Sequence, residues 1–192
     1  MQKRIFLMVS CVVLLQTAYA VSYHYLYAPW RTDYILNTGH KPVVSYEKED
    51  CVFCKQIESR DDDVYFILHR YKHHVIILNK YPYNTGHLLI IPYEHAAHLD
   101  DLSQEVRFEL MELIMHSTTL LKKVLDAHAV NVGINLGRAA GAGIPAHLHV
   151  HLVPRWEGDT GFLDTCAQTK LVPVDLQKVY AQLKPYFAVI DI

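Results

Sequence analysis

Three histidines alternate with apolar residues in one short segment, His147-Leu-His149-Val-His151-Leu-Val-Pro154. In an extended strand alternate residues point to the same face, so the three imidazoles share one face and the apolar side chains share the other. The apolar face can pack on a core, whereas the histidine face carries groups that titrate near neutral pH. The pattern predicts a half-buried strand over residues 147–154 that carries nucleophilic or acid–base chemistry.

The length and composition are those of a globular domain. The chain has 192 residues, of which 51% are hydrophobic and 20% charged, and its formal net charge is −2. This is enough chain for one domain with its own core. There is no basic excess, so a nucleic-acid partner is not indicated.

The first twenty residues have the pattern of a secretory signal peptide. A basic start at residues 1–4 precedes an apolar run at residues 5–15, and Ala18-Tyr-Ala20 fits the cleavage rule. The run is short for a membrane span, so we expect no stable span after its removal. An uncleaved anchor or a mis-assigned start is the alternative.

Residues 21–50 indicate an irregular N-terminal arm, because they are rich in tyrosine and are interrupted by prolines. Ser103 can cap a long helix over about 103–128, whose apolar residues recur at helical spacing. A shorter helix is expected at 174–183 and a loop at 155–171. Strands are expected at residues 64–69, 74–79, 87–91, 130–136 and 147–154.

The order of these elements, β-β-β-α-β-β, predicts an α+β fold in which an antiparallel sheet packs against the long helix. The main domain would span residues 51–165, followed by a C-terminal extension at 166–192. Glu109 is expected on the solvated face of the long helix, and His69, His73 and His74 in a charged, solvated stretch.

The histidine segment resembles the core pattern of the histidine triad family of nucleotide hydrolases and transferases, His-φ-His-φ-His-φ-φ, where φ is hydrophobic. The similarity extends over about residues 26–184. Further matches are Asn79, Gly86-His87, Pro92 and His95, and Asn135-Leu-Gly137 with Ala140–Gly143. Tyr27–Arg31, Pro154–Thr160 and Gln168–Lys170 look like bacterial members that cleave diadenosine polyphosphates.

The resemblance implies a nucleotide substrate and makes His149 the nucleophile that attacks an α-phosphate. The resulting nucleotidyl-histidine would be released by water or by phosphate. His87 and His151 match positions around the phosphates, where they would stabilise charge or assist proton transfer. Mg²⁺ could accompany the nucleotide. The implied nucleotide-binding residues are Asn79, on the sugar, and Asn135, Gly137, Gly141, Gly143 and His151.

The sequence departs from the family pattern at two places in this region. Gly158-Asp-Thr-Gly161-Phe-Leu163 stands where bacterial relatives usually read Gly-Asp-x-Asn-Phe-Met. The loop before the triad has Gly143 or Ile144 where many relatives have a glutamine. Both departures remove a hydrogen-bonding side chain, so they bear on the choice of acceptor or substrate.

Cys51-x-x-Cys54 can supply two corners of a tetrahedral zinc site. The resemblance implies that His95 and His147 complete a structural zinc site, and His98 is a local rival of His95. The alternative is a pair of buried or oxidised cysteines, especially after export. A thiol redox role lacks the strand-then-helix setting of such motifs.

The resemblance also implies a homodimer that pairs through the long helix and the sheet edge, although the apolar stripe could be entirely intramolecular. A cytoplasmic location is usual for the family, whereas residues 1–20 favour export. A non-catalytic nucleotide- or zinc-binding module is the alternative to an enzyme.

Overall fold

The structure, a computed structural model, describes residues 47–170 and 175–189. The expected signal peptide and residues 21–46 of the expected arm lie outside these ranges. The described part begins with a short 3₁₀ turn, η1 (Lys48–Asp50). Within the described ranges, none of the helices has both the length and the apolar character that a membrane crossing requires.

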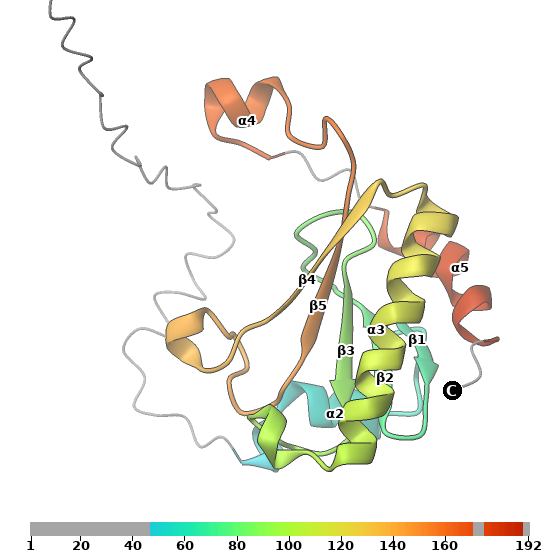
Figure 1. Ribbon diagram of the computed structural model, residues 1–192, viewed down its shortest axis with the longest axis vertical. Coiled ribbons are helices and arrows are strands. Elements are labelled where there is room, and N and C mark those ends of the chain that lie inside the picture. Colours follow the sequence, from blue (N-terminus) through green and yellow to red (C-terminus); the bar gives the residue numbers. More distant parts are fainter. Residues whose placement is uncertain (1–46, 171–174, 190–192) are drawn as a thin grey trace, which may run out of the picture.

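Five antiparallel strands form a single sheet in the order β1-β2-β3-β5-β4 (Figure 1). This arrangement and its helices confirm the α+β expectation. The third and last strands along the chain pair directly, so the histidine strand lies inside the sheet. The bounds are β1 Ile67–Arg70, β2 His74–Leu78, β3 Leu88–Pro92, β4 Ala129–Ile134 and β5 Val150–Arg155.

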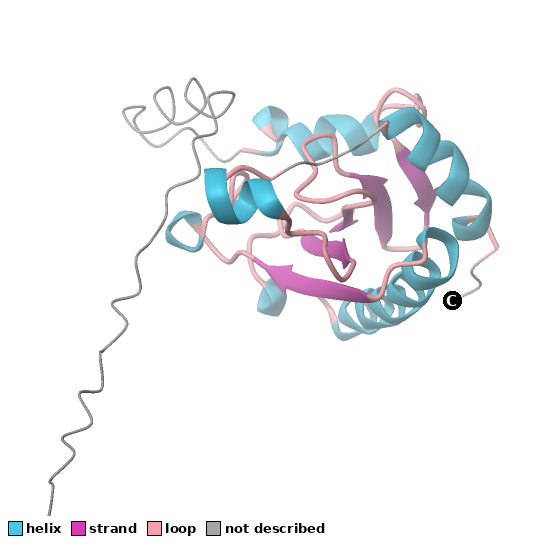
Figure 2. Ribbon diagram, turned by 90° about the horizontal axis from the view of Figure 1, so that it is seen from above, coloured by secondary structure: helices cyan, strands magenta, loops and turns pink. Residues whose placement is uncertain are grey.

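The two faces of the sheet are covered by different helices, and seen from above the strands lie among them (Figure 2). The long helix α3 (Gln104–Leu125) and α5 (Leu176–Phe187) pack on one face, over residues such as Leu88 and Val150. The short helix α2 (Val52–Glu58) packs on the other face, over residues such as Leu89. The strands β1, β2 and β3 thus contribute alternate side chains to two separate cores.

The long helix begins as expected and ends slightly early. Ser103 accepts a hydrogen bond from the backbone N–H of Val106 at 3.3 Å, which caps the first turn. The helix ends at Leu125 because Asp126 adopts a left-handed conformation, with φ +51°.

The C-terminal segment differs from the expectation in two places. Residues 155–171 were expected as a loop, but Phe162–Ala167 form a helix, α4, which stands apart from the sheet (Figure 1). Its start is stabilised by the Asp164 carboxylate, which accepts the Gly161 N–H at 3.0 Å. The following helix, α5, starts after an Asp175 cap and runs to Phe187, beyond the expected end.

His74 and Glu109 were expected to face solvent, but both are buried. His74 is fully buried and Glu109 is 8% exposed. The imidazole Nδ1 lies 2.9 Å from a Glu109 carboxylate oxygen, and the same carboxylate accepts the His73 N–H. A charged group can be buried when a partner satisfies it, and this partner comes from β2, which the pattern along one helix does not show.

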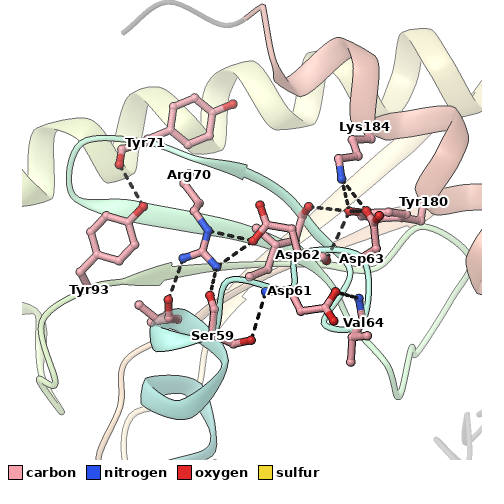
Figure 3. Close-up of polar contacts among 12 residues, drawn as sticks. Ser59, Asp61, Asp62, Asp63, Val64, Arg70, Tyr71, Tyr93, Tyr180 and Lys184 are labelled. Carbon is pink, nitrogen blue, oxygen red and sulfur yellow. Dashed lines mark hydrogen bonds and ion pairs between the residues drawn. The ribbon is translucent and has the colours of Figure 1, made fainter.

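Arg70 fixes the end of α2 to the sheet (Figure 3). Its guanidinium donates to the carbonyls of Ile57 and Ser59 at 2.7 and 2.8 Å. It also donates to the Asp62 carboxylate from Nε and Nη2, at 2.9 and 2.8 Å. A strand residue therefore satisfies one carbonyl of the last turn of α2 and the carbonyl of its C-cap, which sets the position of the helix on its face.

Candidate active site and metal centre

The triad histidines lie on the face of the sheet that α2 covers. Val150 and Leu152 point into the core beneath α3, so His149 and His151 point the other way. The strand starts at Val150, not at residue 147 as expected. The preceding residues are held by a bond from the Leu148 N–H to the Ala96 carbonyl at 2.7 Å.

One hydrogen bond sets the protonation of His149. Its Nδ1 lies 2.8 Å from the His147 carbonyl oxygen. A carbonyl only accepts, so Nδ1 carries the proton and Nε2 of the neutral ring carries the lone pair. Burial lowers the pKa of His149, and the His147 carbonyl opposes this only partly. A neutral imidazole with its lone pair on Nε2 is the form that can act as a nucleophile.

A chain of hydrogen bonds fixes the other two histidines. The Tyr83 N–H donates to His87 Nδ1 at 3.1 Å, and the Asn79 amide lies 3.2 Å from the same nitrogen. Because Nδ1 accepts, the proton of neutral His87 is on Nε2, which donates to His151 Nδ1 at 2.9 Å. The proton of neutral His151 is therefore on Nε2, a buried atom with no hydrogen-bond partner among the described residues.

Burial keeps this chain neutral. Desolvation, with a smaller contribution from the neighbouring histidines, lowers the pKa of His87 to about 3 and that of His151 to about 4. The unpartnered Nε2–H of His151 is a buried donor, and a buried donor usually has an acceptor. A phosphate oxygen beside His149 would supply one, since the His149 and His151 ring centroids are 5.0 Å apart.

Aromatic rings enclose this site, and a glycine leaves one side open. Phe53 of α2 packs on His149 with a centroid distance of 5.0 Å. Tyr83 stacks on His151 at 5.7 Å with an interplanar angle of 18°. Gly133 pairs with His151 across the sheet, and within the described ranges a Cβ there would meet nothing within 4 Å. As far as the structure describes the chain, the sheet surface beside His151 is therefore open to a ligand.

The glycine-rich loop before the triad uses several of its amides internally. A 3₁₀ turn, η3 (Arg138–Ala140), is closed by bonds from Ala140 and Ala142 to the Gly137 carbonyl. Gly137 and Gly141 have φ +83° and +93°, which glycine adopts without strain. A phosphate would therefore meet only part of the backbone N–H set that the resemblance implied.

The four expected metal ligands come together. The ligand atoms of Cys51, Cys54, His95 and His147 all lie within 4.8 Å of one another. Cys51 Sγ lies 3.2 Å from His147 Nδ1, and Cys54 Sγ lies 3.3 Å from His95 Nδ1. Tetrahedral zinc with bonds of roughly 2.0–2.3 Å has ligand–ligand separations of roughly 3.3–3.8 Å. The described structure does not place the rival, the exposed His98, in this cluster.

The protonation of the cluster also suits a metal. His147 Nε2 donates to the Pro92 carbonyl at 2.9 Å, so Nδ1 presents its lone pair to the thiols. Burial and the neighbouring Cys51 raise the pKa of Cys54 to about 12, so without a cation the thiol keeps its proton. A divalent metal would displace these protons, and its charge would stabilise the thiolates. These residues could hold such a metal as a structural centre.

Several residues of the site escaped the sequence analysis. Nothing in the sequence indicated that Phe53 belongs to the site, apart from its position between Cys51 and Cys54. Tyr83 lies in a turn-rich loop, and its stacking depends on a register between strands that are far apart in the chain. Gly133 looked like an ordinary strand residue. The missing information was the pairing of β3 with β5 for Tyr83, and the pairing of β4 with β5 for Gly133.

The fold and the site define a histidine triad protein. The profile of the HIT domain matches residues 61–158. An AP-4-A phosphorylase of Mycobacterium tuberculosis is 34% identical over 148 residues, covering 77% of this chain and 76% of that protein. An asymmetrical bis(5'-nucleosyl)-tetraphosphatase of Schizosaccharomyces pombe is 33% identical over 93 residues, covering 48% and 50%.

Solved structures agree with this assignment. A zinc-bound histidine triad family protein from Mycobacterium smegmatis has a TM-score of 0.60 at 26% identity, with 74% of this chain and 96% of that chain covered. The chain belongs to the histidine triad (HIT) family.

Proposed function

We propose that the protein cleaves diadenosine polyphosphates or related nucleotides through a nucleotidyl-histidine intermediate on His149. The observation that carries this is the bond from His149 Nδ1 to the His147 carbonyl, which leaves Nε2 as the attacking atom. The names of the two relatives, a phosphorylase and a tetraphosphatase, support the substrate class.

In the first step His149 Nε2 attacks the α-phosphorus. A P–N bond forms while the P–O bond to the departing polyphosphate breaks, and the electron pair leaves with that oxygen. The ring becomes positively charged, and its Nδ1–H is already bound to the His147 carbonyl. His151 Nε2–H donates to a phosphate oxygen and stabilises the charge that develops there. His87 holds His151 in this donor form.

In the second step an acceptor attacks the same phosphorus and releases His149. Water would yield the nucleoside monophosphate and phosphate would yield the diphosphate. Asn135, Gly137, Gly141 and Gly143 remain our proposed contacts to the nucleotide. The proposed contact of Asn79 with the sugar has to be compatible with its bonds to His87 and to the Tyr81 N–H.

Phosphate is the acceptor that we expect to work faster. Phosphate is an anion at neutral pH and needs no base. Water needs a base to remove its proton, and His151 is not free to act as one, because its Nδ1 already accepts a hydrogen bond from His87. Diadenosine tetraphosphate is incubated with and without inorganic phosphate, and all products are separated by chromatography. We expect ADP and ATP with phosphate present. Equal rates and AMP in both reactions would show that water is the acceptor.

The intermediate itself separates an enzyme from a binding module. Protein is mixed with substrate labelled at the α-phosphate, denatured in alkali, which preserves P–N bonds, and then treated with acid. We expect a label that stays with the protein in alkali and is lost in acid. Tight substrate binding by calorimetry with no such label would favour a binding module.

We also propose a homodimer that forms through α3 and the β4 edge. Phe108, Met111 and Met115 are 69%, 64% and 51% exposed, and the first two line an open groove on α3. Val132 on the edge strand β4 is 45% exposed. Among the described residues no strand pairs with the outer edge of β4, and such an edge beside exposed apolar side chains is a surface that a second copy can cover.

Met111→Glu is expected to convert the dimer into a monomer, because a carboxylate would be buried without a partner in an apolar interface. Lys122→Glu, also on α3 but at its charged last turn, is the control that should stay dimeric. Sedimentation equilibrium measures both masses. A dimeric Met111→Glu protein would place the interface elsewhere.

A further inference from the structure

The loop between β2 and β3 holds a buried amide. This is the side-chain amide of Asn84, a residue that is only 3% exposed. Its Nδ2 lies 2.9 Å from the Pro154 carbonyl in β5 and 2.9 Å from a carboxylate oxygen of Asp159. Both amide hydrogens therefore have acceptors. Without these partners the buried donors would be unsatisfied, so the loop is strongly tied to this end of β5.

Asp159 is held by a second set of contacts. Arg155 donates to its carboxylate from Nε at 2.6 Å and from Nη2 at 2.9 Å, and the Trp156 N–H donates at 3.3 Å. The side chain is 8% exposed. The Arg155 guanidinium holds the pKa of this carboxyl well below its usual range, so Asp159 is an anion. We call Asn84, Asp159 and Arg155 the loop clamp.

The clamped residue lies next to the histidine chain. The Asn84 carbonyl accepts the backbone N–H of His87 at 3.2 Å. The preceding residue, Tyr83, donates its N–H to His87 Nδ1 and stacks its ring on His151. A shift of the loop would therefore move the Tyr83 amide and ring relative to both histidines.

We propose that the loop clamp sets the tautomer of the histidine chain. By holding the Tyr83 N–H against His87 Nδ1, it keeps the His87 proton on Nε2. His151 then presents Nε2–H, and not a lone pair, toward the phosphates. This inference rests on the proposed function, and the clamp residues are positioning residues that touch no reacting atom.

Asn84→Ala is the direct test in the full-length, zinc-loaded protein. Long-range ¹H–¹⁵N spectra of the imidazoles report which nitrogen of His87 is protonated. We expect one tautomer in the wild type and a mixture in the variant. With diadenosine tetraphosphate we expect kcat to fall about tenfold to a hundredfold, the size of effect that a small misplacement produces, with KM changed less than about threefold.

Two further variants make the test decisive. Asp159→Asn keeps the size of the side chain and removes its charge, so it should reproduce both effects, and it decides the outcome if Asn84→Ala fails to fold. Asn131→Ala removes only the outer contact of Arg155, at 3.0 Å, and should leave kcat within about twofold. Wild-type tautomer and kcat in a folded Asn84→Ala or Asp159→Asn protein would overturn the clamp, and would mean that Asn79 alone fixes His87.

The proposed function and the clamp fail in different ways. A wild type that turns over no nucleotide would refute the proposed function, while the spectra would still decide the clamp. An active wild type whose variants keep both the His87 tautomer and kcat would refute only the clamp.

Discussion

His149→Ala is expected to lower kcat for diadenosine tetraphosphate by at least about a thousandfold, since the reaction loses its covalent nucleophile. The side chain contributes little to the main core, because it lies on the α2 face beside Phe53 and His151. We therefore expect the fold to survive, with an unchanged circular dichroism spectrum and an unchanged metal content. Steady-state rates and the labelling experiment measure the loss.

His116→Ala is the matched control, because His116 is a partly exposed residue of α3 outside the histidine cluster. It should keep the wild-type rate. A folded His149→Ala protein that retains more than about a tenth of the rate would contradict covalent catalysis, for which the loss must be far larger. A loss in His116→Ala as large as that in His149→Ala would point to a general effect of substitution.

The sheet and the histidine face could be predicted because both follow from local patterns. Alternation in β5 determines which side chains enter the core, and Val150 and Leu152 occupy that core as expected. The resemblance together with this alternation predicted His149 as the nucleophile. The tautomer of His149 could not be predicted, because its hydrogen bond to the His147 carbonyl depends on how the chain bends just before the strand.

Contacts between distant segments explain what the sequence did not predict. The Glu109–His74 pair joins α3 to β2, and the Asn84–Asp159 contact joins residues 75 positions apart. In each case the side chain looked like a solvated or turn residue in its own segment. These side chains become buried only when the partner segment packs against them. The hydrophobic periodicity of either segment alone therefore does not predict their burial.

Cys54→Ala is expected to abolish binding of one zinc ion per chain and to lower the melting temperature by about 8–16 °C. A metal present at about a thousand times its dissociation constant stabilises a protein by about 4 kcal/mol. For a domain of this size each kcal/mol corresponds to about 2–4 °C. The effect is large because the ligands come from segments around residues 51–54, 95 and 147, which the metal would tie together. Elemental analysis and calorimetry measure both quantities.

His98→Ala is the control, since His98 is exposed and outside the cluster. It should keep its zinc and its melting temperature, whereas His95→Ala should behave like Cys54→Ala. Zinc retained by Cys54→Ala, or lost from His98→Ala, would contradict this ligand set. Loss of zinc should also lower kcat, because the backbone carbonyl of His147 accepts the hydrogen bond from His149 Nδ1–H while the His147 ring would hold the metal. A zinc-free protein with full activity would show that the centre stabilises the fold without positioning the nucleophile.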